Sequence, residues 1–217
     1  MRTSPRKVLL IAFASAVIAT VAVIALMPRI AITSFLPYHD QFGLGRMDEW
    51  TAYGGVWQLG GGAITNASDD IGAKLVTGSA RLKNYTVQSD VKLTNSFGDA
   101  GLIVRVADAE EGTNAFNGYY AGIRLPDQLL LGKMDFGYRP LSRATIPMGV
   151  KPGLWYRLSV EANGCTITAK ATSINGDLLA TASATDPNDQ CDQSGAFGLR
   201  SFAAGGSWRN VLVEAAP

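Results

Sequence analysis

Hydrophobic and polar residues follow two different patterns along this chain. Residues 8–27, VLLIAFASAVIATVAVIALM, form one apolar run without a charge. From Trp50 onward, short stretches alternate apolar and polar residues and are separated by Gly, Asn, Asp and Pro. An apolar run of this length predicts a helix that crosses a membrane, whereas alternation with a period of two predicts half-buried strands. The sequence therefore predicts one apolar helix followed by a β-rich domain.

We interpret the apolar run as a retained signal anchor and not as a cleaved leader. A helix rising 1.5 Å per residue spans a hydrocarbon core of about 30 Å with this length, whereas the apolar part of a signal peptide has about 7 to 15 residues. Met27 and Pro28 stand where a cleavage site would need small residues. Arg2, Arg6 and Lys7 precede the run, which places the N-terminus in the cytoplasm and the main domain in the periplasm or outside the cell.

This interpretation divides the chain into four segments. They are a cytoplasmic N-terminus (1–7), a transmembrane helix (8–27), an interfacial tether (28–41) and an extracytoplasmic β-sandwich domain (42–217).

Small residues recur along the predicted helix at spacings of three and four. Such a stripe lets a second helix approach closely, so it predicts packing against another membrane protein subunit. The alternative is that these small residues face only lipid. The stripe consists of Ala12, Ser15, Ala16, Ala19 and Ala22.

The remaining chain has the pattern of an antiparallel β-protein. Residues 85–93, YTVQSDVKL, place Tyr85, Val87, Val91 and Leu93 on one face of a strand and polar residues on the other. The pairs Asn163-Gly164 and Asn175-Gly176 favour tight hairpin turns. About a dozen such strands predict an all-β, two-sheet antiparallel sandwich.

Charge and cysteine content narrow the functions further. The formal net charge is +1 with 17% charged residues, so the chain lacks the basic field that nucleic-acid binding needs. Cys165 and Cys191 both follow the anchor and share its far side. We predict a disulfide between them, with two buried free thiols as the alternative.

An ordered series of motifs carries a family resemblance. The motifs are WTAYGGVWQLGGGAI, AGLIVRV, GYYAGIR, LLLGKMD, PGLWYRLSVEANGCTITA, GAFGLRSF and WRNVLVE. On these motifs, the chain resembles the concanavalin A-like lectin/glucanase superfamily, and within it the levan-binding type of carbohydrate module and the 3-keto-disaccharide hydrolase-like domains. The resemblance covers about residues 42–215 and implies a jelly-roll fold.

The residue sets of known catalysts are largely missing from the sequence. The glucanase branch of this superfamily uses two Glu flanking an Asp on one strand, and no Glu-x-Asp-x-Glu motif occurs here. The acidic cluster of Asp108, Glu110 and Glu111 lies in a predicted loop. His39 is the single histidine, and no G-x-S-x-G motif occurs, so the sequence does not support a Ser-His-Asp triad. We therefore expect a protein without catalytic residues.

Alternation predicts one polar sheet face suited to a glycan. If Leu102, Val104, Leu158 and Val160 point inward, their neighbours project outward and offer an aromatic ring and charged groups to a sugar. The alternative is a solvated face with ion pairs such as Arg105 with Asp90. The candidate glycan-binding residues are Arg105, Tyr120, Arg124, Arg157 and Glu161.

A structural calcium ion is a further candidate, since sandwich modules of this kind often bind one where the terminal strands meet. Asp40 and Asn210 are its nearest oxygen ligands, although no acidic cluster surrounds them.

Three functions are consistent with these features. The first is a non-catalytic, single-pass membrane protein that serves as an accessory subunit of a larger membrane protein complex, docked through its helix and its sandwich. The second is a membrane-anchored carbohydrate-binding module. The third is a 3-keto-glycoside hydrolase-like enzyme, which the resemblance permits but no identified residue set supports. We expect the first, with the bilayer and other membrane protein subunits as partners and no cofactor beyond the candidate calcium.

Overall fold

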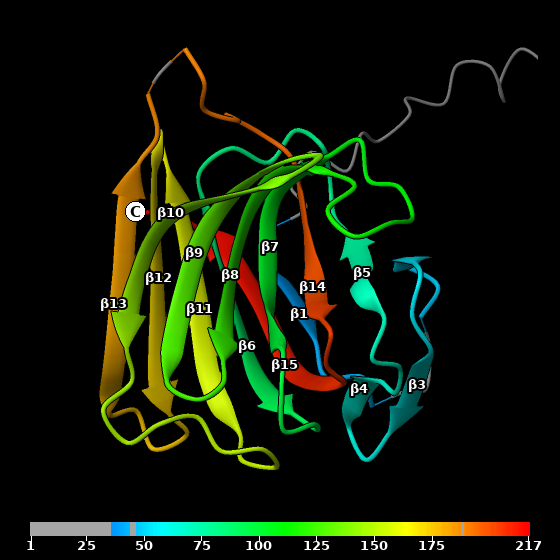
Figure 1. Cartoon of the computed structure of the whole chain (residues 1–217). Coiled ribbons are helices and arrows are strands. Elements are labelled where there is room, and N and C mark those ends of the chain that lie inside the picture. Colours follow the sequence, from blue (N-terminus) through cyan, green and yellow to red (C-terminus); the bar gives the residue numbers. More distant parts are fainter. Residues whose placement is uncertain (1–35, 44–46, 188) are drawn as a thin grey trace, which may run out of the picture. The chain divides into compact units, whose positions relative to one another are not determined.

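The described part of the chain is built from strands, turns and loops and contains no helix (Figure 1). A computed structural model describes residues 36–43, 47–187 and 189–217. Within these residues, no helix is long and apolar enough to cross a membrane. The predicted transmembrane helix and its packing residues Ala12, Ser15, Ala16, Ala19 and Ala22 lie outside the described residues.

In the described residues, fifteen strands form two antiparallel sheets that pack face to face. In the larger sheet the order is β13 (Leu178–Thr185), β12 (Thr166–Ser173), β11 (Tyr156–Asn163), β6 (Tyr85–Leu93), β15 (Gly206–Ala215), β4 (Ala63–Asn66) and β3 (Trp57–Gly60), with β1 (Tyr38–Asp40) also paired to β15. In the other it is β10 (Tyr138–Thr145), β9 (Gln128–Asp135), β8 (Asn117–Arg124), β7 (Asp99–Ala107), β14 (Ala196–Phe202), β5 (Ile71–Thr77) and β2 (Thr51–Tyr53). The predicted two-sheet antiparallel sandwich is confirmed.

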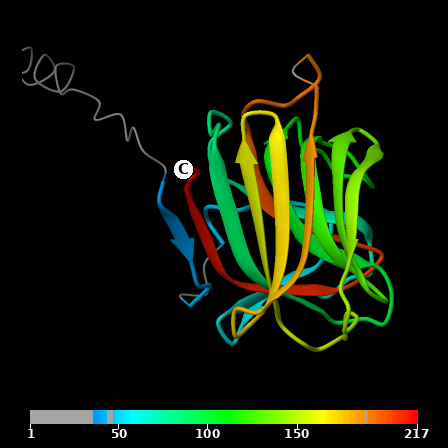
Figure 2. The same cartoon turned by 90° about the vertical axis from the view of Figure 1, so that its left-hand side faces the viewer.

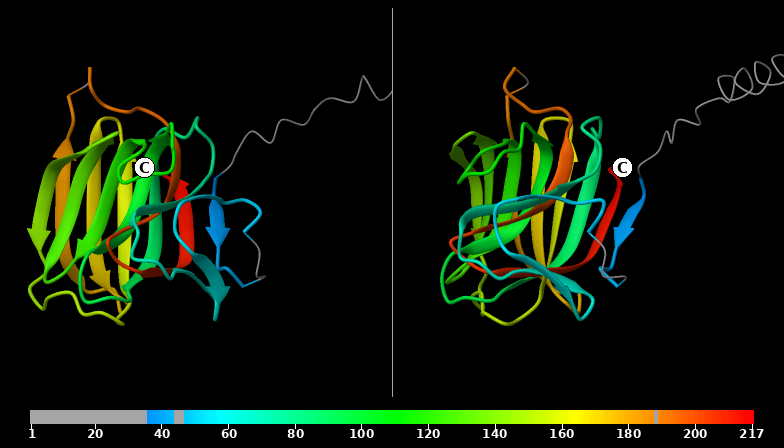
Figure 3. Two further views of the ribbon diagram at one scale, coloured as in Figure 1. Left: turned by 45° about the vertical axis from the view of Figure 1, so that its right-hand side comes forward. Right: turned by 90° about the vertical axis from the view of Figure 1, so that its right-hand side faces the viewer.

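The predicted hairpins join neighbouring strands of the larger sheet. Asn163-Gly164 connects β11 to β12, and Asn175-Gly176 connects β12 to β13. Figure 2 looks onto this sheet and shows β15, β6, β11, β12 and β13 side by side. At its edge, β1 lies beside β15, next to the C-terminus (Figure 3). The last residues of the predicted tether are therefore part of the sheet.

The core lies between the two sheets, as the alternation predicts. Leu102, Val104, Leu158 and Val160 are fully buried there. Trp208 links the two sheets, because its indole Nε1 donates a hydrogen bond to the Gly101 carbonyl of β7 across the core. This hydrogen bond ties β15 of the larger sheet to β7 of the other sheet.

Strand β7 is buried on both of its faces, which alternation alone does not predict. The loop of residues 108–116 covers part of its outer face, where Ile103, Phe116 and Tyr120 form a second, smaller apolar cluster. Arg105 is also buried.

A buried ion pair closes one end of the sandwich. The Asp186 carboxylate accepts hydrogen bonds from Lys133 Nζ (2.9 Å), Arg139 Nη2 (2.7 Å) and the Tyr119 hydroxyl (3.1 Å). Asp186 follows β13, and Lys133 also pairs with Asp192 (3.5 Å) in the connection to β14. The network therefore ties this connection to both sheets.

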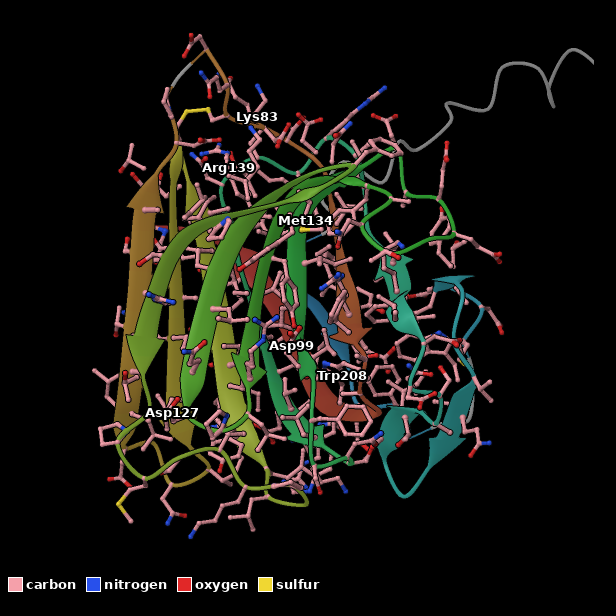
Figure 4. The ribbon with its side chains drawn as sticks, in the orientation of Figure 1. Lys83, Asp99, Asp127, Met134, Arg139 and Trp208 are labelled. Carbon is pink, nitrogen blue, oxygen red and sulfur yellow. A yellow bond between two sulfur atoms is a disulfide. The ribbon has the colours of Figure 1, made fainter. Side chains whose placement is uncertain are left out.

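The predicted disulfide between Cys165 and Cys191 is confirmed. It joins the β11–β12 turn to the β13–β14 connection, at the end of the sandwich where Figure 4 shows Arg139 and Lys83 beside the yellow sulfur bond. The two cysteines are 26 positions apart in the sequence.

We expect replacement of both cysteines by alanine to lower the free energy of unfolding by about 3 kcal/mol, because the unfolded chain gains the freedom that the closed loop denies it. Urea denaturation of the variant and the native protein measures the difference. A reducing agent serves as the control, since it should destabilise the native protein and leave the variant unchanged. Equal stability of the oxidised native protein and the variant would contradict the prediction.

Candidate functional site

Cross-strand register brings charged residues together on the outer face of the seven-stranded sheet. Asp99, the first residue of β7, lies opposite Arg124 of β8 and Phe202 of β14. Two residues farther along β7, Gly101 lies opposite Arg200 of β14. Residues two apart on a strand share a face, and the residues between them point into the core. Asp99, Arg124 and Arg200 therefore converge on the outer side, where Figure 4 labels Asp99.

Glycines on this face make room for aromatic rings to lie against the sheet. A Cβ atom at Gly122 would lie 2.1 Å from the Tyr120 hydroxyl oxygen. At Gly132 it would lie 2.2 Å from Cε2 of Tyr138. Both glycines are needed because any side chain there would displace a ring. The two tyrosines thus form part of the wall around the Asp99 carboxylate.

The Asp99 carboxylate is buried and accepts hydrogen bonds at both oxygens. Its Oδ1 accepts from the Tyr120 hydroxyl at 2.5 Å, and its Oδ2 accepts from Arg124 Nε (2.9 Å) and Nη2 (2.6 Å). Arg200 Nη1 lies 3.9 Å from Oδ1. Charge-assisted bonds of this kind fix the arginine geometry, so the carboxylate orients the groups that line the pocket.

Arg200 is almost fully buried and retains one unpaired donor. Its guanidinium lies over the rings of Tyr120 (4.6 Å) and Phe202 (5.4 Å). Its Nη2 donates to the Thr113 carbonyl and to Asn114 Oδ1. Its Nε has no acceptor among the described residues. A buried donor without a partner is costly, so a ligand acceptor at this point would stabilise the site.

Two buried cations hold the 108–116 loop over the sheet. Besides Arg200, Lys74 of β5 donates from Nζ to the carbonyls of Gly112 (2.9 Å) and Gly72 (3.2 Å). Burial lowers the pKa of Lys74 to about 8, and the neighbouring Arg200 charge adds to this effect. Burial also raises the pKa of Tyr120 well above its usual value, and the Asp99 charge contributes. Tyr120 therefore stays protonated and donates to Asp99.

These groups surround a small cavity that opens onto a larger depression. The cavity has a volume of about 90 Å³, and the depression over β9 and β10 has a volume of about 450 Å³. Arg124 and Tyr138 line both. No described residue accepts a hydrogen bond from Arg124 Nη1 or pairs with the Tyr138 hydroxyl. The cavity is lined by Asp99, Asn114, Tyr120, Arg124, Tyr138, Arg200 and Phe202.

The structure unites only two of the five predicted glycan-binding residues. Tyr120 and Arg124 both contact Asp99. Arg157 and Glu161 belong to β11 of the other sheet, so they cannot share a face with Tyr120. Their assignment to the same face as Tyr120 is wrong, because alternation along single strands does not show which strands share a sheet.

The prediction that Arg105 projects outward is also wrong. Its backbone adopts a positive φ of 53° at a β-bulge, which turns the side chain toward the end of the sandwich. There Arg105 Nη1 donates to the Asp192 carbonyl (2.6 Å) and Nε to the Lys83 carbonyl (3.2 Å). Its expected partner Asp90 instead pairs with Arg157 and Arg209.

Three central residues were missed from the sequence, namely Asp99, Tyr138 and Arg200. Asp99 stands directly before the AGLIVRV motif and Arg200 within GAFGLRSF. Alternation extended by one residue to Asp99, and followed within GAFGLRSF to Arg200, places both on the outer face, but their convergence depends on strand order.

The candidate calcium ligands have other partners within the protein. Asp40 accepts hydrogen bonds from the Phe42 amide and from Trp50 Nε1, and the Asn210 amide donates to Asp90. The described residues hold no group of three or more His, Cys, Asp or Glu side chains that could hold a metal ion. The calcium site stays a prediction.

Comparison with known families identifies the domain. The model of the 3-keto-alpha-glucoside-1,2-lyase-like domain matches residues 42–214. The chain belongs to this family. A search of curated proteins returned no match. The family match and the solved structures below agree with the expected concanavalin A-like jelly roll.

Solved structures show the same fold at low sequence identity. The carbohydrate binding module CBM66 from Bacillus subtilis is 20% identical, with a TM-score of 0.62 over 77% of this chain and 96% of that one. A Bacillus subtilis protein of unknown function with a galectin-like fold is 13% identical, with a TM-score of 0.64 over 83% and 96%. The VIP36 exoplasmic/lumenal domain, bound to Ca²⁺ and Man3GlcNAc, is 12% identical, with a TM-score of 0.57 over 79% and 86%.

Proposed function

We propose that this domain binds a saccharide in the pocket around Asp99. The observation that carries the proposal is the buried carboxylate that orients Arg124 and Tyr120 at the pocket floor, beside the unpaired Nε of Arg200. Sugar hydroxyls on neighbouring carbons can accept hydrogen bonds from a guanidinium held in this way. Membership of a glycoside-related family and a fold shared with a carbohydrate binding module support the same conclusion.

The size and apolar surface of the pocket also suit a sugar. One side of the Tyr138 ring packs against Gly132, and the ring is only partly buried, so it can stack against a sugar ring. A cavity of about 90 Å³ has room for one sugar residue at most, and the adjoining depression can hold the next. The 108–116 loop closes the opposite side.

The contacts around Asp99 favour binding over catalysis. A general base must point a carboxylate oxygen at the proton that it takes from the substrate. Asp99 already accepts hydrogen bonds from Tyr120 at Oδ1 and from Arg124 at Oδ2, so a substrate proton would have to compete with these donors, and no other carboxylate among the described residues lines the cavity. We therefore propose a binding module, with a 3-keto-glycoside-cleaving enzyme as the second candidate that the family name suggests.

The predicted membrane anchor adds a location to this proposal. If residues 8–27 span a membrane, the domain presents its pocket on the extracytoplasmic side. The role of accessory subunit in a larger membrane complex also depends on residues 8–27, which lie outside the described residues. It stays a prediction.

Isothermal titration of the full-length protein with fructan and β-glucan oligosaccharides tests the proposal. We expect Arg124→Ala and Tyr138→Ala each to weaken binding by about tenfold or more, since each removes a contact worth about 1.5 kcal/mol. Arg81→Ala is the matched control, because Arg81 is exposed and lies in the loop before β6, which contacts the start of β14 at the other end of β7 from Asp99. Tyr138→Phe separates the ring from its hydroxyl.

Two results would contradict the proposal. One is binding no tighter than millimolar to every saccharide tested. The other is tight binding that Arg124→Ala leaves unchanged. Turnover of a 3-keto-glycoside by the native protein, lost in Arg124→Ala, would favour the enzyme.

A further inference from the structure

The outer face of the eight-stranded sheet carries a second cluster of charged residues. Figure 2 shows this face, with β15, β6 and β11 side by side. Asp90 of β6 lies directly between Arg157 of β11 and Arg209 of β15 in the strand register. The three side chains therefore project from one row across three strands.

The buried Asp90 carboxylate organises this cluster. Asp90 is only 1% exposed. Its Oδ1 accepts from Arg157 Nε (2.9 Å), and its Oδ2 accepts from Arg209 Nε (3.2 Å) and from Asn210 Nδ2 (2.9 Å). Burial of a carboxylate is favourable only with such complete pairing. The arginines are thus held in fixed positions.

A β-bulge makes this convergence geometrically feasible. Consecutive strand residues normally point to opposite faces, yet Arg209 and Asn210 both reach Asp90. The register shifts between Arg209 and Leu212, and Asn210 has a φ of 54°. Bulges re-aim side chains, and a left-handed asparagine carries a conformational cost that the surrounding contacts must offset.

The terminal nitrogens of both arginines remain available to a ligand. Arg157 and Arg209 contact Asp90 only through Nε, and no described residue accepts a hydrogen bond from their Nη atoms. Each side chain is 34% exposed. The partly buried ring of Trp155 lies beside them, with Arg209 at 4.4 Å and Lys92 at 4.6 Å from its centre. Two positive side chains thus flank Asp90, and a third, Lys92, lies over the Trp155 ring.

We infer that this cluster is a second binding site, for the carboxylate or sulfate group of an acidic saccharide. Paired guanidinium groups match the planar geometry of such oxyanions, and Trp155 offers an adjacent apolar surface to the sugar. A membrane surface fits less well, because binding to anionic lipids usually takes four to eight basic residues. We call the cluster the Asp90 site.

The Asp90 site is independent of the proposed function. It shares no residue with the Asp99 pocket and belongs to the other sheet. A result against one site therefore leaves the other proposal standing, because Arg124→Ala tests the Asp99 pocket and the Arg157 and Arg209 variants test the Asp90 site.

Titration of the full-length protein with an oligogalacturonate, its neutral galactose counterpart and sodium sulfate tests this inference. We expect the oligogalacturonate to bind with a sub-millimolar dissociation constant that rises with salt, and the neutral sugar to bind at least tenfold more weakly at this site. The double variant Arg157→Gln/Arg209→Gln should lose at least tenfold in affinity, whereas Arg81→Ala, a change at an exposed position outside both sites, should retain it.

A second double variant protects the test against unfolding, because removal of both arginines leaves Asp90 unpaired. Arg157→Lys/Arg209→Lys keeps positive charge beside Asp90 but removes the planar donors, so at least threefold weaker binding is expected in a folded protein. Unchanged affinity in this variant overturns the inference. Equal affinity for sulfate alone, or arginine-dependent sedimentation with phosphatidylglycerol vesicles but no saccharide binding, also overturns it.

Discussion

Replacing Asp99 by alanine is expected to abolish saccharide binding at the pocket and to lower the free energy of unfolding by about 4 kcal/mol. Removing one member of a buried ion pair leaves the other charge without compensation, which typically costs about 3–5 kcal/mol. Arg200 has a side chain only 3% exposed and cannot turn to water. Arg124, at 39% exposed, can do so, and it would then leave the pocket.

Urea denaturation and titration with the saccharide measure the two effects of Asp99→Ala separately. Asp70→Ala is the control, since Asp70 is exposed and a surface change of this kind stays within about 0.5 kcal/mol. An Asp99→Ala protein that is as stable as the native one would show that the arginines do not depend on this carboxylate.

Replacing Asp186 by asparagine is expected to cost about 4 kcal/mol at neutral pH. Asp186 is 1% exposed and neutralises Lys133 and Arg139, and asparagine keeps the shape but not the charge. Loss of the network would also release the β13–β14 connection, which Asp192 joins to Lys133. Thermal and urea denaturation measure the loss, and Asp69→Asn, at an exposed position, is the control.

The contribution of Asp186 should also depend on pH. Burial raises its pKa, but the hydrogen bonds from Lys133, Arg139 and Tyr119 outweigh this, and the net pKa lies below its ordinary value. A carboxyl with a lowered folded-state pKa stabilises the fold fully above its unfolded pKa of about 3.9, and this contribution is lost as the pH falls through the folded-state pKa.

Burial raises the pKa of the neighbouring Asp192, so its contribution to stability changes with pH in the opposite direction. Comparing the native protein with Asp186→Asn at each pH separates the contribution of Asp186 from that of Asp192. The stability difference should be constant above about pH 5 and shrink below about pH 4. A difference that stays the same down to pH 2 would contradict the assignment.

The fold was predictable from the sequence because it depends on local signals that repeat. Inward positions such as Leu102 and Val160 follow the alternation, and the Asn-Gly pairs stand where hairpins turn. The disulfide followed from two cysteines on the same side of the predicted anchor.

The candidate site was only partly predictable because it depends on register between strands far apart in sequence. Tyr120 and Arg124 were found because they lie four residues apart on one strand and so share a face. Asp99 and Arg200 were missed because they come from strands about a hundred residues apart in sequence. Arg105 was misplaced because a bulge with a positive φ interrupts the alternation. Bulges of this kind leave no reliable mark in a single sequence.

The pairing of β1 with β15 bears on how the domain can be immobilised for binding measurements. Tyr38 lies opposite Val213, so the beginning of the domain and its C-terminus leave the same sheet edge side by side. Attachment to a sensor surface through a C-terminal tag would therefore hold the domain in nearly the same orientation as attachment through residue 36, with both outer sheet faces open to solution.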